Sequence, residues 1–274
     1  MPELAEVEFS RQQWNPGLRQ KIISIHLHSQ KRVFRGTSTA LLARTIQGRH
    51  LRSSHAHGKQ MLFRFGSDAW LGLHLGMTGR LSTATTSHSP RSHDHLVLRT
   101  ARHSLIFQDP RLFGRVRFAL SPQPPSWWSN LPPPLHSPKF SKQKLQKICS
   151  RRSRAPLKAL LLMQQFFPGI GNWMADEILW RAAIHPQRRA GSLPPTEIRT
   201  LWRECRRVAR LALRMIAGHG DVLPPDLNAH IPRTWLFHHR WADGGRCPKT
   251  HEPLLRAAVG GRTTCWSPAQ QPFR

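Results

Sequence analysis

The amino terminus places an amine nucleophile next to a carboxylate. The chain begins Met1-Pro2-Glu3-Leu4, so removal of Met1 would leave the secondary amine of Pro2 free beside Glu3. An α-amine has a reference pKa of about 8, against about 10.4 for lysine, so part of it is unprotonated at neutral pH. An amine beside a general acid or base suits Schiff-base chemistry on a masked aldehyde. The competing interpretation is an ordinary helix start, where proline and acidic residues are also favoured.

A second candidate site is a glycine-rich turn in the carboxyl-terminal half. The residues Pro168-Gly-Ile-Gly-Asn172 end one helical pattern and open the next, which is expected over residues 172–183. Backbone N–H groups at a helix N-terminus bind anions, and the Asn172 side chain adds a further donor. A plain hairpin of two helices would explain the same pattern, but the charge of the chain favours contact with phosphate.

The net charge indicates the kind of partner. Lysine and arginine outnumber aspartate and glutamate by 42 to 14, which gives a formal net charge of +28. So large a surplus repels itself unless a polyanion is present, and it predicts nucleic-acid binding that weakens with salt. Because there is no apolar run of about 18 residues and no signal peptide, we expect a soluble intracellular protein without membrane contact. The cysteine spacing gives no reason to expect disulfides.

The elements that must position these groups fall into two regions. A short helix is expected near residues 3–14, and residues 20–120 carry many short strand patterns, which are typical of a β-sandwich or barrel. The proline-rich residues 121–140 cannot continue either element and form the expected linker. From residue 141 the pattern turns helical, and about the last 35 residues return to strand-like runs. The helices are expected over residues 142–151, 157–165, 172–183 and 195–217.

Three stretches of the chain, in the same order, resemble the formamidopyrimidine-DNA glycosylase and endonuclease VIII family. They are the amino terminus, the glycine-rich turn with its helix and the following Arg181-Ala-Ala-Ile-His-Pro186, and the tail Val259-Gly-Gly-Arg-Thr-Thr264. The resemblance runs across nearly the whole chain. Glu3-Leu4 and the Glu-Val-Glu that follows are similar to the formamidopyrimidine branch, since the endonuclease VIII branch usually has glycine after the glutamate.

Together, pattern and resemblance predict an α+β protein of two domains. Residues 1–120 would form an amino-terminal catalytic β-sandwich with a leading helix, followed by the linker over residues 121–140. Residues 141–230 would form a helical domain with the helix–two-turn–helix DNA-binding motif of the family. Residues 231–274 would form a β-hairpin that corresponds to the zinc finger of the family.

The resemblance implies roles for individual residues. Pro2 matches the Schiff-base nucleophile, Glu3 the acid/base residue, and Lys59 a strand lysine that assists β-elimination. Arg262 matches an arginine that grips the phosphate beside the lesion and is linked to δ-elimination. The residues that fall where the family contacts DNA are His93, Arg111, Arg154, Lys158 and Asn172.

Met77, Arg111 and Phe113 match the three residues that fill the void left by an extruded base. A base taken out of the stack leaves a hole and an unpaired partner. A flexible thioether and an aromatic ring can fill the hole, while an arginine can hydrogen-bond the partner base. Met77 and Phe113 could instead be ordinary core residues, but the glycines and arginines around them favour exposed loops.

The chain departs from the family at the zinc finger. The family spacing C-x2-C-x16-C-x2-C, laid on this chain from its first ligand, falls on Cys247, Thr250, Ser267 and Gln270. Threonine, serine and glutamine are poor zinc ligands, and a set of Cys247, His251 and Cys265 has only three donors at an unfamiliar spacing. We therefore expect no metal or other cofactor. The hairpin should instead be held by the packing of Leu254, Leu255, Val259 and Trp266.

The expected function is that of a bifunctional DNA glycosylase and AP lyase in base excision repair. It would remove oxidised purines (8-oxoguanine and formamidopyrimidines) from double-stranded damaged DNA, as a monomer in the cytoplasm at the nucleoid. A glycosylase that prefers oxidised pyrimidines and a catalytically inactive DNA-binding homologue remain open as alternatives. Leu112 stands where a second arginine often follows Arg111, so the preferred partner base is open too. An RNA-associated basic module would explain the charge but not the amino terminus.

Overall fold

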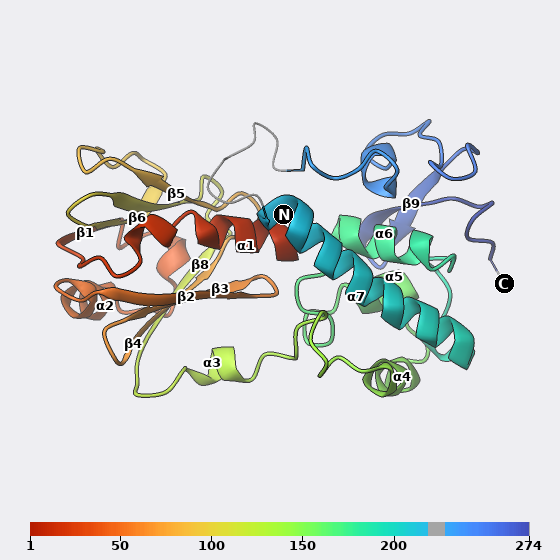
Figure 1. Cartoon of the computed structure of the whole chain (residues 1–274), viewed down its shortest axis with the longest axis horizontal. Helices are drawn as coiled ribbons and strands as arrows, with labels where there is room; N and C mark the ends of the chain where they lie inside the picture. Colours follow the sequence, from red (N-terminus) through yellow and green to blue (C-terminus); the bar gives the residue numbers. More distant parts are fainter. Residues whose placement is uncertain (219–227, 274) are drawn as a thin grey trace. The chain divides into compact units, whose positions relative to one another are not determined.

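The computed structural model of the chain describes residues 1–218 and 228–273. The chain divides into two compact units, residues 1–131 and 132–274 (Figure 1). The division falls inside the proline-rich segment 121–140 that was expected to act as a linker. Residues 219–227 of the expected helical domain lie outside the described residues.

The amino-terminal unit is built from two antiparallel sheets of four strands each. The first sheet has the strand order β1 (Ser24–Leu27), β6 (Asp94–Arg99), β7 (Ser104–Gln108) and β5 (Arg80–Ala84). The second has the order β2 (Leu51–His57), β3 (Gln60–Phe65), β4 (Ala69–His74) and β8 (Arg115–Leu120). Side chains of both sheets, among them Phe63 and Phe107, share one buried core. The predicted β-sandwich is therefore confirmed.

This unit also contains helices, of which the sequence predicted only the first. The leading helix α1 spans Leu4–Gln12, within the range expected for it. Helix α2 (Thr39–Ile46) was not predicted, although Ser38 accepts a hydrogen bond from the Leu41 N–H as its N-cap. A further short helix, α3 (Ser126–Ser129), lies in the segment that was expected to be a linker. Among the described residues, the 3₁₀ turns are η1 (Asn15–Gly17), η2 (Arg32–Phe34), η3 (Ala190–Ser192) and η4 (Leu236–His239).

The carboxyl-terminal unit is helical and ends in a β-hairpin. Its helices are α4 (Lys142–Arg151), α5 (Leu157–Leu161), α6 (Asn172–Arg181) and α7 (Pro195–Ala217), and its strands are β9 (Leu255–Val259) and β10 (Arg262–Trp266). The bounds of α4 and α7 agree with the prediction, whereas α5 ends earlier, at Leu161. The predicted α+β fold with a helical domain and a terminal hairpin is confirmed. None of the described helices is long and apolar enough to cross a membrane.

The hairpin has a small apolar core of its own. It joins Cys247, Leu254 and Cys265 to Trp180 of α6 and Leu236 of η4. Of the residues predicted to hold the hairpin together, Leu254, Val259 and Trp266 are buried, but Leu255 is 49% exposed. The prediction for Leu255 is wrong: Leu255 begins β9, and of the residues of this strand only Val259 is buried.

Candidate active site and nucleic-acid interface

The amino terminus holds the Glu3 carboxylate in a fixed position. Glu3 is the N-cap of α1 and forms a reciprocal capping box with Glu6, whose Oε2 accepts a hydrogen bond from the Glu3 N–H at 3.2 Å. The Glu3 residue is buried, whereas Pro2 is partly exposed and Met1 is exposed. A helix start and a catalytic terminus are therefore compatible, since the cap orients the carboxylate next to Pro2.

Lys59 lies at this terminus. It occupies the turn between β2 and β3, directly after Gly58, which has a positive φ of 60°. Lys59 was expected at the beginning of an apolar strand, and it directly precedes β3, which begins at Gln60. The Lys59 Nζ lies 3.5 Å from the Met1 Sδ. The structure therefore brings together three residues that the resemblance assigned to one reaction, namely Pro2, Glu3 and Lys59.

A cationic pocket in the same unit was not predicted. It has a volume of about 210 Å³, and its lining includes Arg35, His74, Phe113, Arg115 and Arg117. Arg115 and Arg117 are two residues apart on β8, so their side chains leave the strand on the same face. The alternating spacing of Arg115 and Arg117 is visible in the sequence and could have predicted a cationic face at this strand. Three guanidinium groups around one pocket favour a phosphate or another anion.

His74 belongs to this pocket as a neutral side chain. Burial, and then the positive charges of Lys59, Arg117 and Arg35, lower the pKa of His74 to about 4. Its Nδ1 accepts a hydrogen bond from the Gly76 N–H at 3.0 Å. At neutral pH, His74 can thus offer an N–H donor to an anion without adding charge. Because Lys59 acts on His74, the pocket lies near the amino terminus.

The residues predicted to fill the void lie on two exposed loops. Met77 is 37% exposed and Phe113 is 44% exposed, which is inconsistent with a place in the core. The Arg111 guanidinium lies over the Phe113 ring, 4.9 Å from its centroid. A cation–π contact of this kind holds the two side chains as a pair.

A buried carboxylate joins these two loops, and the sequence analysis missed it. Asp109 is fully buried. Its Oδ1 accepts a hydrogen bond from Thr78 Oγ1 at 2.9 Å, next to Met77, and its Oδ2 accepts one from the Gly114 N–H at 2.6 Å, next to Phe113. The exposed His93, which was predicted to contact DNA, accepts a hydrogen bond from the Asp109 N–H at its carbonyl. Asp109 therefore organises the loops that carry the predicted DNA-contacting residues of this unit.

In the carboxyl-terminal unit, the glycine-rich turn leads into α6 as expected, but Asn172 acts differently. Gly169 has a positive φ of 91°, and Gly171 is the N-cap of α6. The Asn172 Nδ2 group, which was expected to face an anion, donates a hydrogen bond to the Thr263 carbonyl of β10 at 2.8 Å. In this structure Asn172 thus fastens the turn to the hairpin. An anion would meet the backbone N–H groups of the helix start.

The structure corrects the role expected for Lys158. Its side chain is fully buried, and its Nζ donates to Asp176 Oδ1 at 2.5 Å and to the Asn172 carbonyl at 2.7 Å. The other oxygen of Asp176 accepts hydrogen bonds from Arg240 and from the Cys265 N–H. A buried ammonium that is held in this way cannot face a phosphate. Lys158 therefore stabilises the turn from inside the fold. Arg154, which precedes α5, is exposed.

The hairpin presents Arg262 at its tip. Arg262 is exposed and follows Gly260 and Gly261, both of which have a positive φ. A Cβ atom at Gly260 would lie only 2.6 Å from the Cβ of Ala159 in α5, so the tip packs closely on the helical part of this unit. Glycine at this position is required both by the backbone conformation and by the close approach. The same unit thus carries Arg262 and the start of α6.

The four positions that correspond to zinc ligands make other contacts. The Cys247 Sγ accepts a hydrogen bond from Trp180 Nε1 at 3.3 Å, and the Ser267 Oγ accepts one from the Gln270 N–H at 3.3 Å. In the part of the chain that the structure describes, no three His, Cys, Asp or Glu side chains are grouped as a metal ion would require. Together with Thr250, these side chains do not form a donor set that suits zinc.

Comparison with known proteins first defines the class. Residues 1–116 match the formamidopyrimidine-DNA glycosylase N-terminal domain, and residues 131–221 match the formamidopyrimidine-DNA glycosylase H2TH domain. An amino-terminal sandwich joined to an H2TH unit, with cationic groups on both, thus defines a DNA-binding glycosylase of DNA repair.

The relatives then define the family. The chain is 33% identical to the formamidopyrimidine-DNA glycosylase of a Thermus thermophilus strain, with 99% of this chain and 98% of the relative covered. It is 31% identical to that of Desulfitobacterium hafniense, with 99% and 100% covered. A crystal structure of Lactococcus lactis Fpg (MutM) with DNA containing N7-benzyl-Fapy-dG matches with a TM-score of 0.87 at 27% identity, covering 99% of this chain and 100% of that one. The chain belongs to the formamidopyrimidine-DNA glycosylase family, which confirms the resemblance.

Proposed function

We propose that this protein removes oxidised purines, 8-oxoguanine and formamidopyrimidines, from double-stranded DNA and then cuts the strand as an AP lyase. The observation that carries this proposal is the grouping at the amino terminus. Glu3 is fixed there by its capping box, and the Lys59 Nζ lies 3.5 Å from the side chain of Met1, the residue that precedes Pro2. A nucleophile, an acid and a cation within one small region suit attack on a sugar carbon followed by elimination.

In the proposed reaction, removal of Met1 exposes the Pro2 amine, which attacks C1′ of the damaged nucleotide. Glu3 protonates the oxygen of the sugar ring, and the C1′–O4′ bond breaks so that the ring opens. The base leaves with the proton that the amine loses as the C1′–N bond breaks. The resulting iminium acidifies the C2′ proton, whose loss begins β-elimination of the 3′ phosphate. A second elimination then releases the 5′ phosphate, with Lys59 and Arg262 holding the phosphates and assisting proton transfer.

The exposed loops support a duplex substrate. Met77, Arg111 and Phe113 are exposed and are tied together through Asp109, as a wedge that replaces an extruded base requires. One L. lactis Fpg structure similar to this chain contains Fapy-dG DNA, which favours purines. Another contains oxidised-pyrimidine DNA, so a preference for oxidised pyrimidines is the second candidate.

The hairpin is proposed to work without zinc, and the protein to act as a monomer at the nucleoid. The support for the zincless hairpin is the apolar core around Trp180, Leu254 and Cys265, together with the polar side chains at the ligand positions. That core would replace the metal as the element that fixes Arg262.

A panel of labelled duplexes tests the proposal. We expect the mature protein to cut a duplex with 8-oxoguanine and leave phosphate on both ends, and to act more slowly on thymine glycol. The Glu3→Gln variant should keep the cap of α1 and bind a duplex with a tetrahydrofuran abasic analogue, yet remove no base. Cleavage of thymine glycol in preference to both purines would support the second candidate. If all duplexes were bound and none were cut, the protein would be an inactive homologue.

A further inference from the structure

Helix α7 carries a continuous row of arginines that the proposed reaction does not use. They are Arg199, Arg203, Arg206, Arg207, Arg210 and Arg214. At about 100° per residue they fall within an arc of about 100°. The buried residues of the helix, such as Leu201, Val208 and Ala212, lie on the opposite side. All of the arginines except the half-buried Arg206 are exposed. The sequence thus builds one apolar face for the core and one strongly cationic face.

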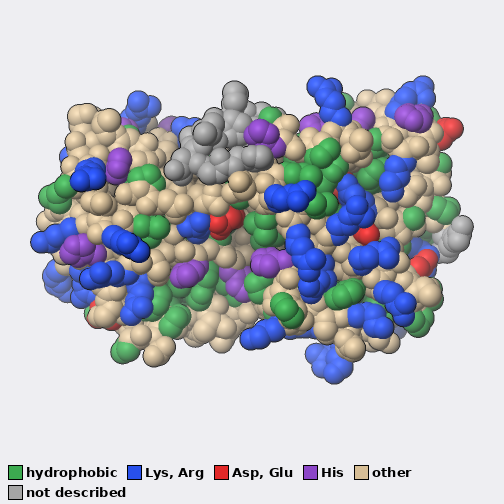
Figure 2. Space-filling model, in the orientation of Figure 1, with side chains coloured by type: hydrophobic (Ala, Val, Ile, Leu, Met, Phe, Trp, Pro, Cys, Tyr) green, Lys and Arg blue, Asp and Glu red, His purple; other side chains and the backbone are tan. Residues whose placement is uncertain are grey.

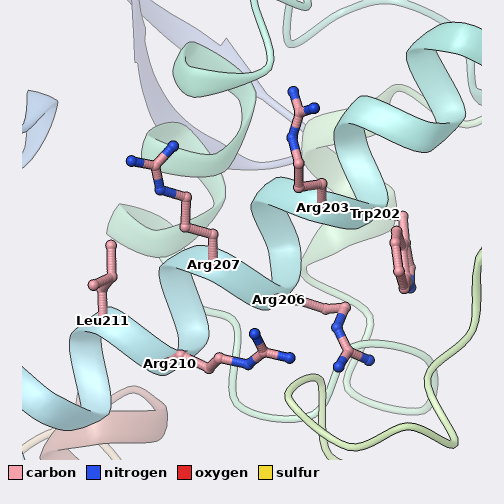
Figure 3. A pocket seen from close by; sticks show the side chains of 6 residues that line it. All are labelled: Trp202, Arg203, Arg206, Arg207, Arg210 and Leu211. Atoms are coloured by element: carbon pink, nitrogen blue, oxygen red, sulfur yellow. The ribbon is translucent and has the colours of Figure 1, made fainter.

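Figure 3 shows how four of these side chains are arranged around the helix. Arg203 and Arg207 extend to one side of α7, and Arg206 and Arg210 extend to the other. Together with Trp202 and Leu211 they line an open groove of about 550 Å³. In the orientation of Figure 1, Lys and Arg side chains cover much of the visible face of this unit, and Asp and Glu are few (Figure 2).

Few acidic side chains neutralise the arginines of this face. In the described part of the chain, their one ion pair joins Arg203 to Glu204 at 3.3 Å, and Glu204 itself is buried. Arg206 is held by the carbonyl groups of Ser137 and His136. Burial and the charge of Arg210 lower the pKa of Arg206. Like charges held this close repel one another, and a bound polyanion would relieve the repulsion.

This face is directed away from the turn and hairpin of the same unit. Helix α6 contacts both α7 and β10, and α7 packs against α6 and α4 with its apolar side. Since the arginines lie opposite the apolar side, they point away from α6. A ligand along α7 would therefore occupy a surface other than the one that carries Asn172 and Arg262.

We propose that the arginine face of α7 binds the phosphate backbone of a second, undamaged DNA duplex while the protein is bound to its substrate duplex. The arginines span 15 residue steps, or about 22 Å at about 1.5 Å per residue. A duplex presents about one phosphate per 1.7 Å of its axis, so phosphates outnumber the arginines along this length. The inference rests on the DNA binding of the family and not on the glycosylase chemistry.

The composition of the face favours DNA over a protein partner. The core of a protein–protein interface is depleted in charged residues and contains apolar anchors. Here the indole N–H of Trp202 is already bonded to the Phe140 carbonyl at 2.8 Å, and Arg206 covers the Trp202 ring. Leu211, partly exposed, is the other apolar side chain that lines the groove.

The test uses a variant of the face and a control with the same charge. The test variant combines Arg199→Gln, Arg203→Gln, Arg207→Gln and Arg210→Gln. The control combines Arg32→Gln, Arg44→Gln, Arg52→Gln and Arg102→Gln, which are exposed residues of the amino-terminal unit. Each variant loses four of the charges that give +28, so both have +24.

The full-length protein is first saturated with a tetrahydrofuran-containing duplex that carries one dye, and an undamaged duplex with a second dye is then titrated. Wild type and control should retain the second duplex, and the α7 variant should bind it about tenfold more weakly or worse. With four fewer phosphate contacts, its slope of log K against log salt should be shallower by about 3.6. Replacing the same four arginines by lysine should preserve binding.

Three results would overturn the inference. They are a wild-type protein that retains no second duplex, an equal loss in test variant and control, and displacement of the second duplex by polyglutamate as readily as by DNA, which would indicate an acidic protein partner. Binding of the first duplex is read in its own dye. A failure of the proposed function is thereby distinguished from a failure of this inference.

Discussion

At the scale of single residues, the candidate active site depends on side chains that each serve the fold and the chemistry at once. Glu3 caps α1 and is the proposed acid, so its position is fixed before any substrate binds. His74 ends β4, receives the Gly76 N–H and lines the cationic pocket. In both cases a backbone contact orients a titratable group, which reduces the entropy lost when DNA is bound.

The low pKa of His74 makes stability depend on pH. Its pKa in the folded protein is about 4, below the ordinary value of 6.5. Between these values the unfolded chain binds a proton at His74 that the folded chain does not bind. Stability should therefore fall as pH drops from about 6.5 to about 4, by up to about 3 kcal/mol. The His74→Asn variant keeps an acceptor for Gly76 and should flatten this part of the curve. Thermal midpoints of wild type and variant between pH 7.5 and pH 4.5 measure this pH dependence. Parallel curves for the two proteins would refute the role of His74.

At the scale of elements, the loops and turns are held by buried carboxylates. Asp109 joins the loop of Met77 to the loop of Phe113, and Asp176 joins α5 and α6 to the hairpin through Lys158 and the Cys265 N–H. Loops that must keep their conformation when DNA binds need such internal hydrogen bonds, because exposed loops have few apolar contacts.

The Asp109→Ala variant should lose stability and base removal together. It leaves the Gly114 N–H and the Thr78 hydroxyl without their acceptor in a buried place, which costs about 3 kcal/mol. Asp109→Asn is the matched control, since its oxygen can accept from Gly114 while the Thr78 hydroxyl turns to accept from the amide. Denaturant unfolding measures the stability of both variants, and single-turnover kinetics measure their rates of base removal. Equal effects of the two substitutions would contradict the role assigned to the carboxylate.

Lys158 should behave as a structural residue. The Lys158→Met variant leaves Asp176 with one cation fewer in a buried site and should destabilise the protein by about 3 kcal/mol. Because Lys158 touches no phosphate in this account, the slope of DNA affinity against salt should stay unchanged. Arg154→Gln is the contrast, with little effect on stability and a slope shallower by about 0.9. A shallower salt slope for Lys158→Met would show that Lys158 does contact a DNA phosphate.

At the scale of the whole molecule, the chain carries a large positive charge on two units, one with the proposed chemistry and one with the H2TH turn and hairpin. In the proposed function, the charge supplies affinity for any duplex, and the exposed side chains of each unit supply the contacts that act on damage.

The loss of three of the four zinc ligands at the family positions should make the protein resistant to chelators. Treatment with 1,10-phenanthroline should change neither the thermal midpoint nor strand cleavage, because the hairpin is packed around Trp180, Leu254 and Cys265. Metal analysis of the purified protein should find less than stoichiometric zinc. A lower midpoint after chelation, restored by zinc, would show that the hairpin holds a metal after all.

How far the sequence could predict this molecule depends on the kind of signal. Helices α4 and α7 have strong apolar periodicity, so their bounds could be predicted. Helix α2 is short and lies among strand patterns, so its capping residue Ser38 was overlooked. Exposure of Met77 and Phe113 followed from neighbouring glycines and arginines. The burial of Lys158 and the link through Asp109 depend on partners far along the chain, which no local pattern reveals.

Covalent trapping tests whether the Pro2 amine is the nucleophile. The mature protein is mixed with a duplex containing 8-oxoguanine in the presence of borohydride, and the adduct is digested and analysed by mass spectrometry. We expect a covalent link between the sugar and the amine of Pro2, and no such link in a form that retains Met1. An adduct on Lys59 or another lysine, or no adduct despite base removal by a protein with a free Pro2, would contradict it.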